Sequence, residues 1–168
     1  MTALSILNIK EFMHILLCTD TFDSFLLSEG SITTYMTFLL NGHSRPDFFS
    51  PEDTYYEQTV QEDYVPFSLV RPACFDLIKG KRTPSSFKFI FQLSQKNLER
   101  TLASVGRTLS AENISGMHLN LIYQNQKLTC TTGVSRHMFS PDKSLEHIWD
   151  EMVKQFLKNH KIPFEPLV

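Results

Sequence analysis

The sequence lacks the motifs on which the common catalytic and metal sites depend. Six glycines are scattered singly, and Gly80-Lys81 lacks the upstream glycine of a phosphate-binding loop. The six histidines show no His-Glu-x-x-His or related ligand spacing, and no Gly-x-Ser-x-Gly motif occurs. We therefore predict no catalytic residues, no metal site and no cofactor, and an enzyme remains the less favoured class.

Cysteine is also scarce. Cys18, Cys74 and Cys130 form no Cys-x-x-Cys pair, and their odd number argues against a disulfide framework. Each lies in an apolar pattern, so we predict that all three are buried in the core. A thiol nucleophile would need a histidine beside it, and the predicted hairpin register brings only His118 near Cys130, on the opposite sheet face.

No apolar run approaches the roughly 20 residues of a membrane helix. The first six residues lack the basic and apolar regions of a secretory signal. We expect a soluble cytoplasmic protein without membrane contact. A chain of 168 residues with 42% hydrophobic content suits one sizeable core, so we predict a single domain over 1–168, with 161–168 an extended tail.

Capping residues predict where the helices begin. Asn8 with Glu11 three residues later is a capping-box pattern, and Ser94 offers a second cap. The predicted helices span about residues 9–18, 69–79 and 95–105, the last ended by Gly106, and a short helix or helical turn is predicted after Ser50-Pro51. Gly80 stands where a left-handed residue after a helix is wanted, and Pro72 fits a first helical turn.

The clearest helix starts near Ser144. Its apolar residues keep the i, i+3, i+4 spacing of an amphipathic helix and are Leu145, Ile148, Trp149, Met152, Val153, Phe156 and Leu157. Asp150 and Lys154 stand four residues apart, so we predict an ion pair between them.

Several segments have strand character. We predict a short strand over 4–7, and β-branched and aromatic residues over 25–40 lead to Asn41-Gly42, a strong hairpin signal. A returning strand would then reach Phe48 or Phe49. Farther on, Phe87, Phe89 and Phe91 alternate with polar or smaller residues, which predicts a strand with its phenylalanines facing the core.

A second hairpin has a predictable register. If Asn125-Gln126 form the loop, Leu121 faces Cys130 and Leu119 faces Thr132. The core face then carries Leu119, Leu121, Tyr123, Leu128, Cys130 and Val134, and the other face His118, Asn120, Thr129 and Thr131. Asn-Gln is a poorer tight turn than Asn-Gly, so this register depends on an unusual loop.

The segments around 7–16 and 93–102 align cap to cap and apolar to apolar. Each is followed by a hairpin, so two βαββ-like units are one interpretation and chance similarity is the other. Either way we predict an α+β fold, a mainly antiparallel sheet with helices packed on one face and an amphipathic C-terminal helix.

The charges are unevenly distributed. Residues 71–107 hold eight Lys or Arg against two acids, and residues 11–70 hold ten acids against Arg45 alone. Within the basic segment we predict an anion-binding site at Lys79, Lys81, Arg82 and Lys88. The alternative is structural, because cations also complement the end of a helix. The acidic stretch 47–63 is interpreted as a solvated face that can neutralise the basic one within the fold or across a dimer.

Glu29 is a polar residue between apolar strand segments. If buried, it would have the raised pKa of an acid/base group, but a turn or solvent-facing position is the favoured interpretation.

Residues 75–84 with Phe87-Lys88-Phe89, 128–133 and 143–146 resemble an uncharacterised domain-of-unknown-function family from anaerobic gut Firmicutes. The resemblance spans nearly the whole chain. It implies a single cytoplasmic bacterial domain and brings no activity, substrate or catalytic residue with it.

We therefore predict a non-enzymatic binding or interaction module of unknown partner, with a protein partner or a homodimer as candidates. One alternative is binding of an anion or a nucleic acid through the basic turn, which no sequence motif supports. The other is a small-molecule enzyme, which would need a deep pocket with clustered titratable groups, for example Glu29 with a histidine.

Overall fold

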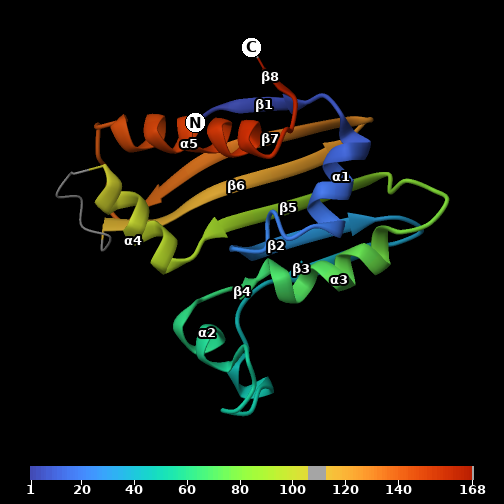
Figure 1. Cartoon of the computed structure of the whole chain (residues 1–168), viewed down its shortest axis with the longest axis horizontal. Coiled ribbons are helices and arrows are strands. Elements are labelled where there is room, and N and C mark those ends of the chain that lie inside the picture. The colour runs from blue at the N-terminus through green and yellow to red at the C-terminus, as the bar shows by residue number, and fades with distance from the viewer. Residues whose placement is uncertain (106–112, 168) are drawn as a thin grey trace.

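The computed structural model describes residues 1–105 and 113–167 and confirms the α+β class. Within these residues eight antiparallel strands form one sheet in the order β3-β2-β5-β6-β7-β1-β8, with β4 paired to β2 (Figure 1). The strands are β1 (Ala3–Ile6), β2 (Phe25–Thr33), β3 (Thr37–Asn41), β4 (Val65–Pro66), β5 (Ser86–Leu93), β6 (Ile114–Gln124), β7 (Lys127–Arg136) and β8 (Phe164–Pro166). The helices are α1 (Ile9–Cys18), α2 (Tyr56–Gln61), α3 (Phe67–Ile78), α4 (Gln95–Ser104) and α5 (Ser144–Asn159), with a 3₁₀ turn, η1, at Pro46–Phe48.

The core lies between one face of the sheet and helices α1, α3, α4 and α5. Phe87, Phe89 and Phe91 of β5 all point into it and are at most 3% exposed. Phe91 packs against Phe67 of α3 with ring centroids 4.9 Å apart, and against Phe22 at 5.7 Å. The predicted inward phenylalanines are thus confirmed, and they join the helices to the middle of the sheet.

Both predicted caps are present. The Asn8 side chain accepts a hydrogen bond from the Glu11 N–H (3.1 Å), and the Ser94 hydroxyl accepts one from the Asn97 N–H (3.3 Å). These caps satisfy N–H groups that have no partner within the helix. The helices accordingly begin at Ile9 and Gln95, as predicted. Gly106, the predicted end of the 95–105 helix, lies outside the described residues.

The β6–β7 register is confirmed. Leu121 pairs with Cys130 and Leu119 with Thr132, and Asn125-Gln126 form the loop. Both loop residues have positive φ, 52° and 61°, which is the backbone of the tight hairpin turn that Asn-Gly favours. The strands therefore impose a left-handed conformation on a glutamine.

The predicted hairpin at Asn41-Gly42 is wrong. The turn lies at 34–36, between β2 and β3, and β3 ends at Asn41. Gly42 is needed for close approach instead, because a Cβ there would lie 1.7 Å from the Leu27 carbonyl oxygen. The chain continues alongside β2 at this point, where the Gly42 N–H donates to the Ser28 carbonyl at 3.0 Å, and the local sequence does not reveal this contact.

The chain then forms a lobe over residues 42–66, here called the acidic lobe, which projects from the sheet around α2 (Figure 1). No returning strand reaches Phe48 or Phe49; η1 stands there instead. Of the short helix or helical turn predicted after Ser50-Pro51, the turn is present, since the Asp53 N–H donates to the Ser50 carbonyl at 2.9 Å, and the helix itself starts later, at Tyr56. The Glu62 carboxylate accepts from the Gln95 N–H at 3.0 Å, which ties the lobe to α4.

Two further helix details differ from the predictions. Helix α3 begins at Phe67, so Pro72 stands inside it. In α5, Lys154 pairs with Glu151 at 2.7 Å instead of with Asp150. Asp150 is only 8% exposed and accepts a hydrogen bond from the Thr132 hydroxyl of β7. The helical phase points Asp150 to the sheet, whereas spacing alone suggested a solvent pair.

The two βαββ-like runs share their order of elements but not their place in the sheet. β5 pairs with β6 of its own run, whereas β1 pairs with β7 and β8 and not with β2. The similarity therefore holds for the strand–helix junctions and their caps.

Replacing Gly42 by Ala should destabilise the protein by about 3 kcal/mol. The new methyl group would overlap the Leu27 carbonyl, so either the Gly42 segment or strand β2 must move. Urea denaturation measures this. Gly133→Ala is the matched control, since the nearest atom lies 4.0 Å from its Cβ position. Equal stability of both variants would contradict the packing at Gly42.

Replacing Gln126 by Gly should stabilise the protein by about 1 kcal/mol, because glycine adopts the left-handed conformation without strain. The greater conformational entropy of glycine in the unfolded chain offsets only part of this gain. The same substitution at Gln124, a strand position, should destabilise it. Thermal unfolding compares the two variants, and a lower melting temperature for Gln126→Gly would refute the turn geometry.

Candidate anion-binding site

The predicted site lies on the loop of residues 79–85 that joins α3 to β5, here called the basic loop. An ion pair positions α3, since the Arg71 guanidinium donates to both oxygens of Asp23 at 2.8 and 3.0 Å. Gly80, with φ of 139°, turns the chain out of the helix. At the other end the Ser85 N–H donates to the Thr33 carbonyl at 3.0 Å. The loop is therefore held at both ends.

The cations of this loop have different surroundings. Lys79 pairs with Asp76 one turn back at 3.0 Å and lies over the Phe75 ring. Lys81 and Arg82 are exposed, and within the described residues neither has an ion pair or a side-chain hydrogen bond. Lys79 already serves the end of α3, so the helix gives no reason for the two cations beyond Gly80.

Lys88, the fourth predicted residue, lies apart from the others. It stands on β5, facing away from the core, and its ammonium group is 3.5 Å from the Glu29 carboxylate. Glu29 itself is a solvent-facing strand residue with a 61% exposed side chain. The cations of the basic loop are therefore Lys79, Lys81 and Arg82, and Lys88 is not one of them.

The acidic lobe does not neutralise the basic loop within the chain. Across the described residues, no ion pair joins the two, and the loop's one acidic partner is the local Asp76. Figure 1 shows the lobe around α2 projecting below the sheet and the loop between α3 and β5 at the right-hand end of the strands. Of the two neutralisation schemes in the sequence interpretation, the one within the fold is not realised there.

On one side of the basic loop lies a hollow of about 570 Å³, here called the tyrosine hollow. It is lined by Thr34, Tyr35, Phe38, Lys81, Thr83 and Ser85, together with residues 76–80 and Arg82. Tyr35 is 89% exposed and meets Phe38 edge to face. The buried Thr34 hydroxyl has no hydrogen-bond partner among the described residues. Thr34, Lys81 and Arg82 line the same hollow, and hydroxyl, ammonium and guanidinium groups can all donate to an oxyanion.

On the other side lies a groove of about 670 Å³, here called the methionine groove. Its walls come from Ile9 and Met13 of α1, Ile78, Phe87 and Tyr123, and its cations are Lys10, Lys79 and Arg82. Lys10 was missed by the sequence reasoning because it is 69 positions before Lys79 and only the α1–α3 packing brings them together. The basic loop is thus a ridge between two depressions.

A larger recess of about 870 Å³ lies at the other end of β5 and β6. It contains Gln92, Gln95, Glu99, His118, Ser135 and His137, with Asp63 and Tyr64 of the acidic lobe. His118 Nε2 lies 3.0 Å from the Ser135 hydroxyl, and burial lowers the pKa of His118 below its usual range. A serine beside a neutral histidine is the start of a nucleophilic site.

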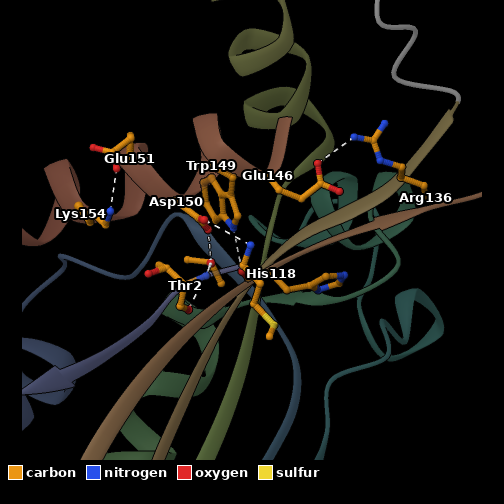
Figure 2. A network of polar contacts seen from close by, with 10 residues as sticks. Thr2, His118, Arg136, Glu146, Trp149, Asp150, Glu151 and Lys154 are labelled. Atoms are coloured by element: carbon orange, nitrogen blue, oxygen red, sulfur yellow. Dashed lines mark hydrogen bonds and ion pairs between the residues drawn. The ribbon is translucent and has the colours of Figure 1, made fainter. Parts of the chain in front are cut away.

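Among the described residues, the recess lacks the orienting acid of such a site. His118 Nδ1 is buried without a hydrogen-bond partner among the described residues, where a triad has its orienting carboxylate. Figure 2 shows that the nearby acids face other groups, since Glu146 binds Arg136 at 3.0 Å. The Trp149 indole N–H donates to the His118 carbonyl at 2.8 Å, which ties α5 to β6. These contacts hold α5 against β6 and β7 and do not activate Ser135.

The family model that matches this chain covers residues 15–165 and is described as a family of unknown function, DUF5721. The chain belongs to this family. No curated protein and no solved structure matches it. The predicted resemblance to an uncharacterised domain family is therefore confirmed, and the basic loop, the tyrosine hollow and most of the methionine groove lie inside the matched residues.

Other site types find little support in this member of DUF5721. Within the described residues no three His, Cys, Asp or Glu side chains are placed to hold a metal ion. Glu29 shares a shallow hollow with His43 but pairs with Lys88 instead. No helix in the described ranges is long and apolar enough to span a bilayer.

The cysteine prediction holds for two of the three residues. Cys74 and Cys130 are fully buried, whereas Cys18, the last residue of α1, is exposed and was wrongly assigned to the core. Burial raises the pKa of both inner thiols to about 12, which suppresses the reactive thiolate.

The native protein should therefore show one fast thiol toward an aromatic disulfide reagent at neutral pH, and three after unfolding in urea. The Cys18→Ser variant should show none until it unfolds. Absorbance of the released thiolate measures the count. A second thiol reacting as fast in the native state would contradict the burial of Cys74 and Cys130.

Proposed function

We propose that this protein is a non-enzymatic binding module that holds an anionic partner on its basic loop. The observation that carries the proposal is that Lys81 and Arg82 stand unpaired on a ridge between two depressions. The proposed ligand group is an oxyanion such as phosphate, which takes charge-assisted hydrogen bonds from Lys81, Arg82 and the Thr34 hydroxyl.

The free energy of the arrangement supports this assignment. Exposed like charges repel one another, and the buried Thr34 hydroxyl without a partner costs about 1–3 kcal/mol. An oxyanion in the tyrosine hollow relieves both terms. Folding alone requires Gly80 for the turn and Lys79 for the helix end, so Lys81 and Arg82 are available for a ligand.

Nucleic acid is a second candidate partner, favoured by Tyr35. Proteins that bind single strands combine cations for the backbone with exposed aromatic rings on which bases stack. Tyr35 is 89% exposed in the same hollow as Lys81 and Arg82. The overall charge of −2 limits general attraction, so such binding would be local and weak at physiological salt.

A protein partner with an acidic surface, including a second copy through its acidic lobe, would engage the same cations. We place the protein in the cytoplasm, as three free thiols are typical of a reducing compartment.

The Lys81→Ala/Arg82→Ala double variant tests the proposal. Labelled single-stranded DNA and RNA are titrated at low and moderate salt, with inorganic pyrophosphate as competitor and fluorescence anisotropy as the readout. Losing two phosphate contacts should reduce the slope of log affinity against log salt by about 1.4. Pyrophosphate should displace the strand from the wild type.

The matched control is Lys96→Ala/Lys158→Ala, which removes the same charge from exposed positions on α4 and α5. This control should bind like the wild type. Both double variants should have the melting temperature of the wild type. The proposed site is wrong if the wild type binds neither the oligonucleotides nor pyrophosphate. It is also wrong if Lys81→Ala/Arg82→Ala binds them as tightly as the wild type does. A salt-dependent dimer lost only in Lys81→Ala/Arg82→Ala would assign the cations to self-association.

A further inference from the structure

The methionine groove differs from the tyrosine hollow in chemistry although both contact the basic loop. Its walls are aliphatic and aromatic, and among the described residues no carboxylate lines it. The tyrosine hollow, in contrast, contains Asp76 and several hydroxyl groups. The groove's volume of about 670 Å³ falls within the usual range of small-molecule sites.

Three cations stand around the apolar walls. Lys10 and Arg82 are exposed and have no ion-pair partner in the part of the chain that the structure describes, and Lys79 pairs only with the exposed Asp76. Lys10 also lies in the first turn of α1, where the helix dipole is positive. The electrostatic potential in the groove is therefore positive, because the cationic side chains and the backbone at the start of α1 both contribute to it.

The exposed parts of the walls favour an aliphatic ligand over a flat aromatic one. Phe87 and Tyr123 are stacked on each other and are 3% and 8% exposed, so they offer edges instead of free ring faces. Ile9, Met13 and Ile78 are half-buried and supply flexible aliphatic surface. The Tyr123 hydroxyl has no hydrogen-bond partner among the described residues and is available as a donor.

We propose that the methionine groove binds an acyl carboxylate, with the alkyl chain against Ile9, Met13 and Ile78 and the carboxylate among Lys10, Lys79 and Arg82. This inference rests on the proposed function, because it takes the basic loop as an anion site and names an amphipathic class of ligand for it. Binding buries apolar surface and pairs cations in one step, which neither an inorganic anion nor a neutral alcohol achieves.

Decanoate, kept below its micelle concentration, is the probe, and isothermal titration calorimetry is the readout, with displacement of anilinonaphthalene sulfonate as a second signal. The Lys10→Ala variant should weaken decanoate binding about fivefold, and Lys10→Glu should abolish it. Lys10 is exposed, so neither change should affect folding. Neutral decanol should bind at least tenfold more weakly than decanoate to the wild type.

Lys81→Ala is the matched control, because Lys81 lines the tyrosine hollow and not the methionine groove. It should leave decanoate affinity within twofold of the wild type while weakening oligonucleotide or pyrophosphate binding. Met13→Gln, which keeps side-chain length but adds a polar end, should weaken decanoate alone.

The outcomes separate the two proposals. If decanoate does not bind, or binds Lys10→Ala and Lys10→Glu as well as the wild type, the acyl assignment is overturned. Phosphate-type binding that Lys81→Ala/Arg82→Ala abolishes would then leave the proposed function standing. If pyrophosphate, oligonucleotides and decanoate all fail to bind, both proposals fall.

Discussion

The structure depends on the phenylalanine face of β5. This strand lies in the interior of the sheet, between β2 and β6, and it presents three consecutive inward phenylalanines to the helices. Phe89 and Phe91 contact Phe67 of α3, and Phe87 stacks on Tyr123 of β6 at 5.1 Å. Each ring buries a large apolar area, so the position of α3 is fixed by the same contacts that fix the sheet.

The basic loop inherits its position from that packing. It leaves α3 at Gly80 and enters β5 at Ser86, so the two elements that the phenylalanines join also hold its ends. The charged side chains are exposed but their backbone is anchored through Ser85 and Thr33. A cation held in this way loses less entropy on binding than one on a free loop, which favours recognition of a compact anion.

The same fold places a different kind of surface at each end of the central strands. Near the start of β5 the surface is cationic and partly apolar, and near its end it is polar, with His118 and Ser135 under the acidic lobe. The second surface lacks the orienting acid that catalysis by a serine would require among the described residues. Binding at the cationic end is the function that we propose.

The sequence by itself determined the local elements. The caps at Asn8 and Ser94, the inward phenylalanines of β5 and the β6–β7 register follow from short-range patterns, because capping and strand alternation involve neighbouring residues. Only the tertiary structure decided the role of Gly42, the burial of Asp150 and the place of Lys10 beside Lys79. Those depend on contacts between segments far apart in the chain, because Gly42 meets β2, Asp150 of α5 meets β7, and Lys10 is placed by the packing of α1 on α3.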